Sequence, residues 1–319
     1  MGDNKFSRRE FIKRGIRTGL SGAGAGIFLM LTGKLSDAVQ PAIKSDAGTL
    51  PDLSVIRKGT PEKAVRRAIE LIGGMKKFVA KNDVVVVKPN IGWDRAPEYA
   101  ATTNPEVVSV LVRMAFEAGA KKVKVFDRAC DNVRRCYVNS GIEKAAKDAG
   151  AEVYSIQDGK KGYVTTKING VSLKEWSVYG DVLECNCFIN VPVAKHHGST
   201  DLTLSMKNLM GVAGGDRGKF HTGGIDQWIA DFALAVKTHL VVIDARRILL
   251  KNGPSGGNLE DVREPKTIIA SADQVAADAY ATTLFGKKPS DIKHIVLACR
   301  DRGGEIDVSK LRIAEENLE

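Results

Sequence analysis

Val84-Val85-Val86-Val87-Lys88-Pro89-Asn90 places four β-branched residues directly before a lysine, a proline and an asparagine. A continuous apolar run of this kind predicts a strand that is covered on both faces. Apolar residues at helical spacing follow over 106–118, and a second short run follows over 122–127. Because parallel strands need a crossover between them, strand, helix and strand in this order predict an α/β fold.

The same alternation continues along most of the chain. We expect further helices over 61–72, 141–149, 225–235 and 272–284, and further strands over 151–155, 187–191, 240–244, 267–270 and 294–297. The run 164–168 is typical of an antiparallel edge insertion. Crossover helices lie on the faces of a parallel sheet. We therefore predict a three-layer sandwich with a mostly parallel central sheet and helices on both faces.

The N-terminal segment carries the features of an export signal. Ser7-Arg8-Arg9-Glu10-Phe11-Ile12-Lys13 resembles the twin-arginine translocation signal and differs from its pattern only by Ile for Leu. Between Arg17 and Lys34 lie 16 uncharged residues, a segment too short and too rich in glycine to favour a spanning helix. Small residues at Ser36 and Ala38 suit a signal peptidase, so we place the cleavage after Ala38.

These features divide the chain into a signal peptide over 1–38, a polar linker over 39–53 and an α/β domain over 54–319. The twin-arginine translocase, the first expected partner, carries folded proteins. Its use implies that something is assembled in the cytoplasm before export, most often a cofactor. The expected location is the periplasm, and the protein is membrane-anchored if the signal stays uncleaved.

Composition and charge narrow the function classes. The chain has 319 residues, of which 43% are hydrophobic, and this excludes disorder for most of it. The net charge is +10, but residues 1–38 supply +4 of it through seven basic and three acidic side chains. The remaining charges are interspersed, so we expect no nucleic-acid partner. A small anionic ligand fits this balance.

The cysteines give no local cofactor motif. Five cysteines are present without any C-x-x-C spacing, so we expect no iron–sulfur cluster of the chain's own. Cys185 and Cys187 lie two residues apart on a predicted strand and therefore point to one face. Burial as small hydrophobic side chains is the first interpretation, and metal or cluster ligation is the alternative.

Polar residues follow the predicted strands, where ligands bind in open α/β sheets. Each of them alone is also typical of a turn or a cap. Together they predict one ligand-binding mouth at the ends of the strands. Lysine and amide side chains suit a carboxylate or phosphate, and carboxylates suit a metal ion. We assign anion binding to Lys88, Asn90 and Asn190, and a suspected metal ion to Asp127 and Asp244.

Residues 190–224 hold three of the chain's five histidines and a glycine-rich loop over 211–219. The loop departs from the P-loop pattern, because Phe220 stands where Ser or Thr should follow the lysine. Its backbone N–H groups can still bind an anion. We assign anion binding here to Lys207, Asn208, Gly214 and Gly215.

Neighbouring residues alternate across a strand, so His196 and His197 cannot both face one site. We favour His197 with His221 as the catalytic pair and keep His196 as the substitute. Lys195 is the third catalytic candidate, because a desolvated lysine acts as a base with a lowered pKa. A solvated surface position is the alternative for each of these side chains.

Six spaced motifs cover about residues 55–285: Val87-Lys88-Pro89-Asn90, Thr102-Thr103-x-Pro105-Glu106-Val107-Val108, Phe126-Asp127, Ile189-Asn190-Val191-Pro192-x-x-Lys195-x-His197, Ser205-x-Lys207-Asn208-x-x-Gly211 and Ala272-x-x-x-Ala276-x-Asp278. Together they resemble the bacterial and archaeal family catalogued as domain of unknown function 362. Many members of that family carry a ferredoxin-like module. The resemblance implies a domain that works beside redox proteins, with a ferredoxin-like protein as partner.

Two function classes stay open from the sequence. The first is an exported, metal- or cofactor-dependent enzyme that acts on a small anionic substrate, with oxidoreductase and isomerase chemistry both open. The second is a non-catalytic cofactor or metal carrier, or a maturation partner of an iron–sulfur redox complex. The cofactor itself stays unknown, and elemental analysis of protein purified with its signal intact separates the two classes.

The export signal gives the first testable prediction. Replacing Arg8 and Arg9 by lysine removes the recognised core of the signal, so the folded protein should stay in the cytoplasm. Fractionation into periplasm and cytoplasm measures this outcome. Unchanged periplasmic recovery of the double variant would contradict the export hypothesis.

Overall fold

The computed structural model describes residues 50–157 and 161–319, and these belong to one unit over Gly48–Glu319. The predicted signal peptide 1–38 and residues 39–49 of the predicted linker lie outside the described residues. The main sheet runs in the order β13-β1-β12-β10-β7-β2-β3-β4. Its strands are β1 (Leu53–Lys58), β2 (Val84–Pro89), β3 (Lys122–Val125), β4 (Glu152–Val153), β7 (Cys187–Val191), β10 (Leu240–Leu249), β12 (Thr267–Ser271) and β13 (Ile313–Leu318), with β8 (Val193–His197), β9 (Asp201–Thr203) and β11 (Val262–Arg263) attached at its side.

Helices connect these strands. They are α2 (Pro61–Leu71), α3 (Pro105–Ala118), α4 (Val133–Asn139), α5 (Ile142–Asp148), α6 (Gly180–Glu184), α7 (Ser205–Asn208), α8 (Lys219–Thr222), α9 (Ile225–Ala235), α10 (Gln274–Thr283) and α11 (Lys293–Arg302). Short 3₁₀ turns lie at Met75–Lys77, Pro97–Tyr99, Leu209–Val212, Leu259–Asp261, Pro289–Asp291 and Val308–Lys310. In the described part of the chain, no helix combines the length and the apolar character needed to cross a membrane.

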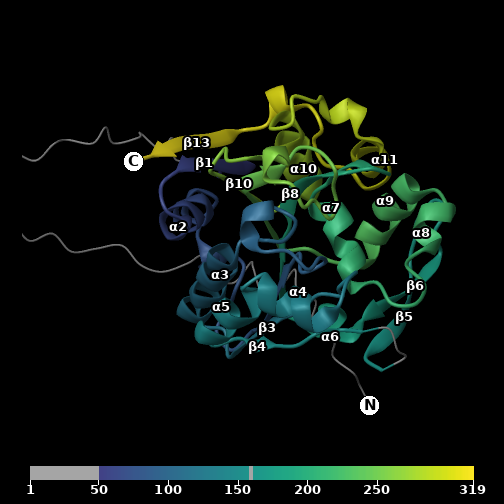
Figure 1. Cartoon of the computed structure of the whole chain (residues 1–319), viewed down its shortest axis with the longest axis horizontal. Helices are drawn as coiled ribbons and strands as arrows, with labels where there is room; N and C mark the ends of the chain where they lie inside the picture. The colour runs from purple at the N-terminus through teal and green to yellow at the C-terminus, as the bar shows by residue number, and fades with distance from the viewer. Residues whose placement is uncertain (1–49, 158–160) are drawn as a thin grey trace, which may run out of the picture. The chain divides into compact units, whose positions relative to one another are not determined.

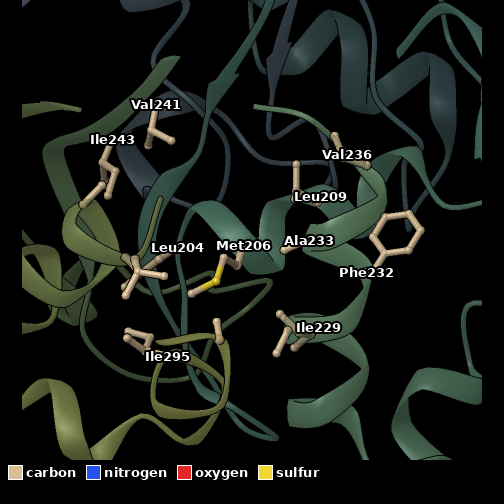
Figure 2. Packing of buried hydrophobic residues seen from close by; sticks show 14 of the residues in the cluster. Leu204, Met206, Leu209, Ile229, Phe232, Ala233, Val236, Val241, Ile243 and Ile295 are labelled. Carbon is tan, nitrogen blue, oxygen red and sulfur yellow. The ribbon is translucent and has the colours of Figure 1, made fainter. Parts of the chain in front are cut away.

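Two hydrophobic cores lie on opposite faces of the sheet, as the four-valine run predicts. Val85 and Val87 pack in one core with α2, α3 and α5, whereas Val86 packs in the other core. The second core is formed with α7, α9, α10 and α11, and Figure 2 shows α9 presenting Ile229 and Ala233 beside Met206 and Leu209. Figure 1 shows α2, α3 and α5 gathered on one side of the molecule and α9 and α11 on the other. The three-layer arrangement is confirmed.

The sheet is mixed but mostly parallel. Strands β4, β3, β2, β7 and β10 pair in parallel, and only β12 runs antiparallel to its two neighbours within the path from β13 to β4. β1 and β13, which lie far apart in the sequence, pair in parallel at one edge (Figure 1). The predicted fold class therefore holds, with an antiparallel strand inserted near that edge.

A break between two consecutive strands positions the later site. Pro192 separates β7 from β8, and its carbonyl oxygen accepts the N–H of Asp244 at 2.8 Å. The long strand β10 pairs with β7 and, in the same register, with the start of β8, and the register shifts only between Asp244 and Leu249. As a result β8 extends the central strand and carries Lys195 and His197 beyond the end of β7.

Three local predictions need correction. The run 294–297 is not a strand but the first part of helix α11, where His294, Ile295 and Ala298 are buried at helical spacing. The last strand is β13, whose Glu-rich sequence hides its pairing with β1. Cys185 follows α6 and lies outside the strand that contains Cys187. A four-residue apolar run does not distinguish a strand from a buried helical turn, and this explains the first error.

The edge insertion forms a separate hairpin. β5 (Tyr163–Lys167) and β6 (Glu175–Tyr179) pair antiparallel in a two-stranded sheet that does not join the main sheet. The hairpin is connected to the glycine-rich loop, because the N–H of Gly214 donates to Ser177 O at 2.8 Å and Val178 bridges to Ala213. The antiparallel pairing was predicted, but the site of attachment was not.

Val86 provides a test of the central sheet. Replacing Val86 by aspartate buries an unpaired charge between two helical layers and should cost about 3–5 kcal/mol of the free energy of unfolding. Val138→Asp, at an exposed position of α4, should cost much less. Thermal and denaturant unfolding of the two variants measures the difference. Equal melting temperatures would contradict the central position of this strand.

Candidate functional site

A cavity of about 400 Å³ opens where β2, β3 and β8 end. This volume suits a small-molecule ligand. Its lining comprises Asn90, Gly92, Trp93, Asp127, Arg128, Cys130, Lys195, His197, Thr203, Lys207, Asn208, Met210, Gly211, Arg217, Gly218, His221 and Pro254. Residues that follow β2 and β3, residues of the β8–β9 hairpin and residues of the glycine-rich loop thus meet at one place.

A buried ion pair forms the floor of this cavity. Lys88 Nζ lies 2.8 Å from Asp127 Oδ1 and also donates to Pro89 O and Asn208 Oδ1, at 2.7 and 3.0 Å. Burial lowers the pKa of Lys88, and the carboxylate of Asp127 opposes this effect. Gly211 crosses directly above the pair, since a Cβ at this position would lie 1.9 Å from Asp127 Oδ1. A glycine is therefore required here.

Three asparagines connect the floor to the cavity wall. Asn208 Oδ1 accepts from Lys88 Nζ and from Asn90 Nδ2, both at 3.0 Å, and Asn208 Nδ2 donates to Asn190 Oδ1 at 2.8 Å. The other end of Asn90 faces the wall, where its Oδ1 accepts from Lys195 Nζ at 3.1 Å. This continuous network fixes the orientation of each amide, because every oxygen faces a donor.

Lys195 is a buried lysine of the cavity wall with a strongly lowered pKa. It is fully buried, and its Nζ donates to Ala101 O at 2.5 Å as well as to Asn90. Burial lowers the pKa of Lys195 to about 7; Cys130 and Asp127 oppose this shift, and Lys207 and Lys88 add to it. About half of these amines are neutral at pH 7, so Lys195 can accept a proton from a ligand.

The two favoured histidines meet in the cavity. Their rings, on His197 and His221, stack with centroids 6.1 Å apart and planes 16° from parallel. Burial, followed by Lys207 and Lys195, lowers the pKa of His197 to about 3, so the ring is neutral. Its Nδ1 accepts the N–H of Ser199 at 3.1 Å, which leaves the proton on Nε2. His196 instead accepts the N–H of Gly253 and does not line the cavity.

Two buried polar groups of the lining lack a good partner. Lys207 is only 7% exposed. Among the described residues, its Nζ has one hydrogen-bond partner, Met210 Sδ at 3.2 Å. Burial lowers the pKa of Lys207 to about 8, which still leaves most of the amines charged at pH 7. Thr203, 4% exposed, has a hydroxyl without any partner in the described chain. Both groups are therefore available to a ligand in the cavity.

The charge of the cavity is strongly positive. Arg128 and Arg217 line it, and both are held by backbone carbonyls: Arg128 donates to Ala213 and Gly215, and Arg217 donates to Arg128 and Ala129. Lys195 and Lys207 also line it, and Asp127, the one carboxylate that the described residues contribute to the lining, is paired with Lys88. The electrostatic field therefore favours an anion.

The predicted site residues separate into groups. Seven of them line the cavity: Asn90, Asp127, Lys195, His197, Lys207, Asn208 and His221. Lys88 and Asn190 lie beneath it, where Lys88 has no N–H left for a ligand. Gly214 and Gly215 do not line it, and the N–H of Gly214 is already bonded to Ser177. The assignment of these four residues to direct anion contact needs correction.

The suspected metal ligands do not fit a metal ion. Asp127 is bonded to Lys88 and accepts two backbone N–H groups, from Arg128 and Ile91. Asp244 lies outside the cavity lining and accepts the N–H groups of Asn104 and Arg246, at 2.7 and 3.0 Å. Burial raises the pKa of Asp244 to about 6. Among the described residues no group of three His, Cys, Asp or Glu could hold a metal.

Several lining residues were not predicted from the sequence. Thr203 lies opposite Lys195 in the β8–β9 pairing, so the hairpin register brings the two side chains to one face. Cys130 and Arg128 follow β3 at the carboxyl edge, and the strand-end rule would have found them had it been extended by three residues. Arg217 lies in the glycine-rich loop, where only the fold shows that it reaches back to 128–130.

Comparison with known proteins places the chain in a family. The model of the family described as Domain of unknown function (DUF362) matches residues 85–283. This chain belongs to the DUF362 family. The thylakoid-associated protein sll1697 of Synechocystis is 27% identical over 248 residues, which cover 76% of this chain and 74% of that protein.

Solved structures resemble the DUF362 chain only in outline. One is the lactate racemase apoprotein from Thermoanaerobacterium thermosaccharolyticum, with a TM-score of 0.45, 10% identity and 72% of this chain covered. Another is a structural-genomics protein from Thermotoga maritima, with a TM-score of 0.45, 12% identity and 71% of this chain covered. The matches span 56% and 58% of those two chains, less than two thirds of their length.

The lysine pKa values give a testable prediction. Because burial disfavours the ammonium form, Lys195 should titrate near pH 7 and Lys207 near pH 8, well below the value of about 10.4 for a model lysine. Reductive methylation with ¹³C-formaldehyde followed by an NMR pH titration measures both, with Lys195→Arg and Lys207→Arg for assignment. Titration of both groups above pH 10 would contradict the described burial.

Proposed function

We propose that this DUF362 protein is an exported enzyme that binds a small carboxylate or phosphate in the cavity and moves a proton on it. The observation that supports this most is Lys207, a buried cation whose ammonium contacts only a thioether among the described residues. A buried charge without a counterion is costly, and an anionic ligand would remove that cost. The Thr203 hydroxyl offers the same ligand a neutral donor.

The remaining cavity groups divide the chemistry between them. Lys195 is the base, since its amine is half neutral at pH 7 and is oriented by Asn90 and Ala101 O. His197 cannot serve as a base through Nδ1, which is occupied, but its Nε2–H can donate to an oxygen that gains charge. His221 is exposed, so its ring can exchange protons with solvent.

Export and cofactor use belong to the same proposal. The twin-arginine pattern supports export of the folded chain to the periplasm, and a folded cargo commonly carries a cofactor. The donor set of this cavity, with amines, guanidinium groups and one paired carboxylate, fits an organic anion better than a metal ion. The resemblance to redox-associated proteins supports a ferredoxin-like protein as neighbour.

Malonate provides a probe for binding and for proton transfer together. We expect malonate to raise the melting temperature of the protein above that in sodium chloride of equal ionic strength. Lys207→Met removes the charge at nearly constant volume and should weaken malonate binding about 10- to 100-fold, as expected for a lost charged hydrogen bond. The control is Lys144→Met, whose side chain is 83% exposed.

The methylene protons of bound malonate report the base. In D₂O, NMR should show faster exchange of these protons with the protein than without it. Lys195→Met should lose the exchange and weaken malonate binding less than Lys207→Met, which should lose both. Stabilisation by malonate that is equal in Lys207→Met and in the unmodified protein would contradict the proposed anion site.

A further inference from the structure

We propose that Cys130 is the nucleophile of this cavity and forms a reversible covalent adduct with the carbonyl carbon of an oxo carboxylate. The inference rests on the proposed function for the anion-binding half of the site and adds a reacting group and a substrate class to it. No sequence motif points to this residue, which follows β3 by five positions.

The thiol is placed among the cations of the cavity. Cys130 is exposed, lines the cavity with Lys195 and Lys207, and its Sγ lies 3.7 Å from a nitrogen of the Arg217 guanidinium. Its N–H donates to Gly92 O at 2.8 Å, which fixes the backbone. A Cβ at Gly92 would lie 4.0 Å from Cys130 Sγ and 3.5 Å from Asn90 Oδ1, so this glycine leaves the space between thiol and network free.

Two features independent of the cysteine indicate a ligand next to it. The Thr203 hydroxyl is buried in the lining without a partner, and the Lys207 ammonium has only a thioether contact in the described chain. Both groups suit the oxygens of a carboxylate. An anion held there lies in the same cavity as Cys130, so its neighbouring carbon can approach the sulfur.

The other cysteines are not equipped for this role. Cys136 and Cys187 are buried, and burial raises their pKa values to about 11 and about 12. Cys185 is half-buried, and burial raises its pKa to about 12. Cys299 contacts Gly304 O in the loop after α11 and does not line the cavity. By contrast, Cys130 is exposed and lines the cavity together with Lys195 and Lys207.

The covalent step balances without an oxidant or reductant. The neutral amine of Lys195 takes the thiol proton, and Cys130 Sγ forms a bond to the carbonyl carbon of the substrate. The electron pair of the C=O π bond moves to the oxygen, which then receives the proton from the Lys195 ammonium. The product is a hemithioacetal or hemithioketal, and the reverse sequence releases the substrate. The Nε2–H of His197 is a further donor for the oxygen while it carries charge.

Alkylation by two reagents that differ in charge tests the nucleophile. Thiols in water react faster with neutral iodoacetamide than with iodoacetate, and Cys299 provides this reference within the same chain. At Cys130 we expect the preference to be reversed, because the cationic cavity concentrates the carboxylate reagent. Peptide mass spectrometry after short incubations at pH 7 gives both rates at both cysteines. Lys207→Met should slow the iodoacetate reaction at Cys130 about tenfold and leave the iodoacetamide reaction nearly unchanged.

Glyoxylate labelled with ¹³C at the aldehyde carbon tests the adduct. NMR should show a protein-bound sp³ carbon resonance that disappears in Cys130→Ser, while that variant keeps malonate binding. A borohydride-reducible imine at Lys195 in place of this resonance would overturn the assignment of the nucleophile. Suppose that Cys130 shows the same reagent preference as Cys299 while malonate binding still depends on Lys207. The assignment of Cys130 as the nucleophile is then wrong, and the proposed anion site is still supported. Malonate binding that is unchanged in Lys207→Met contradicts the anion site itself.

Discussion

The buried pair of Lys88 and Asp127 is the interaction on which the rest of the site depends. Two charges removed from water are tolerated only when both are hydrogen-bonded on all sides, and here Asp127 accepts two backbone N–H groups while Lys88 donates to a carbonyl and an amide. The bonds to Asn208 and from Ile91 link separate segments, so the pair joins β2, β3 and α7 at the carboxyl edge of the sheet. Gly211 then covers it, which brings the Lys207 segment over the cavity.

Much of this arrangement could be predicted from the sequence, because parallel strands share one edge for their carboxyl ends. The four-valine run predicted β2, and the strand-end rule brought Lys88, Asn90 and Asp127 together. The rule was wrong for Asp244 for a physical reason: β10 does not end there but continues to Leu249 beside β8. The carboxylate of Asp244 instead accepts the backbone N–H groups of Asn104 and Arg246, and it does not line the cavity.

The unpredicted part depends on contacts between segments that are distant in the sequence. Thr203 enters the site only through the register of the β8–β9 hairpin, and Arg217 enters because its loop folds back onto 128–130. Neither the register of this hairpin nor the path of this loop can be predicted from composition or periodicity. The run 294–297 shows the same limit on a smaller scale, since four apolar residues fit a strand or a buried turn of α11 equally well.

The distribution of charge over the two cavity lysines couples ligand binding to proton uptake. Lys195 has a pKa of about 7 because it is buried, and Lys207 has a pKa of about 8 for the same reason. An anion bound between them stabilises both ammonium forms, so binding raises both pKa values and the complex takes up protons at neutral pH. A base that gains its proton on binding no longer accepts one from the ligand. The same limit holds for the thiol of Cys130, because in the proposed reaction only the neutral amine of Lys195 accepts the thiol proton, so the step is faster as the pH rises above 7.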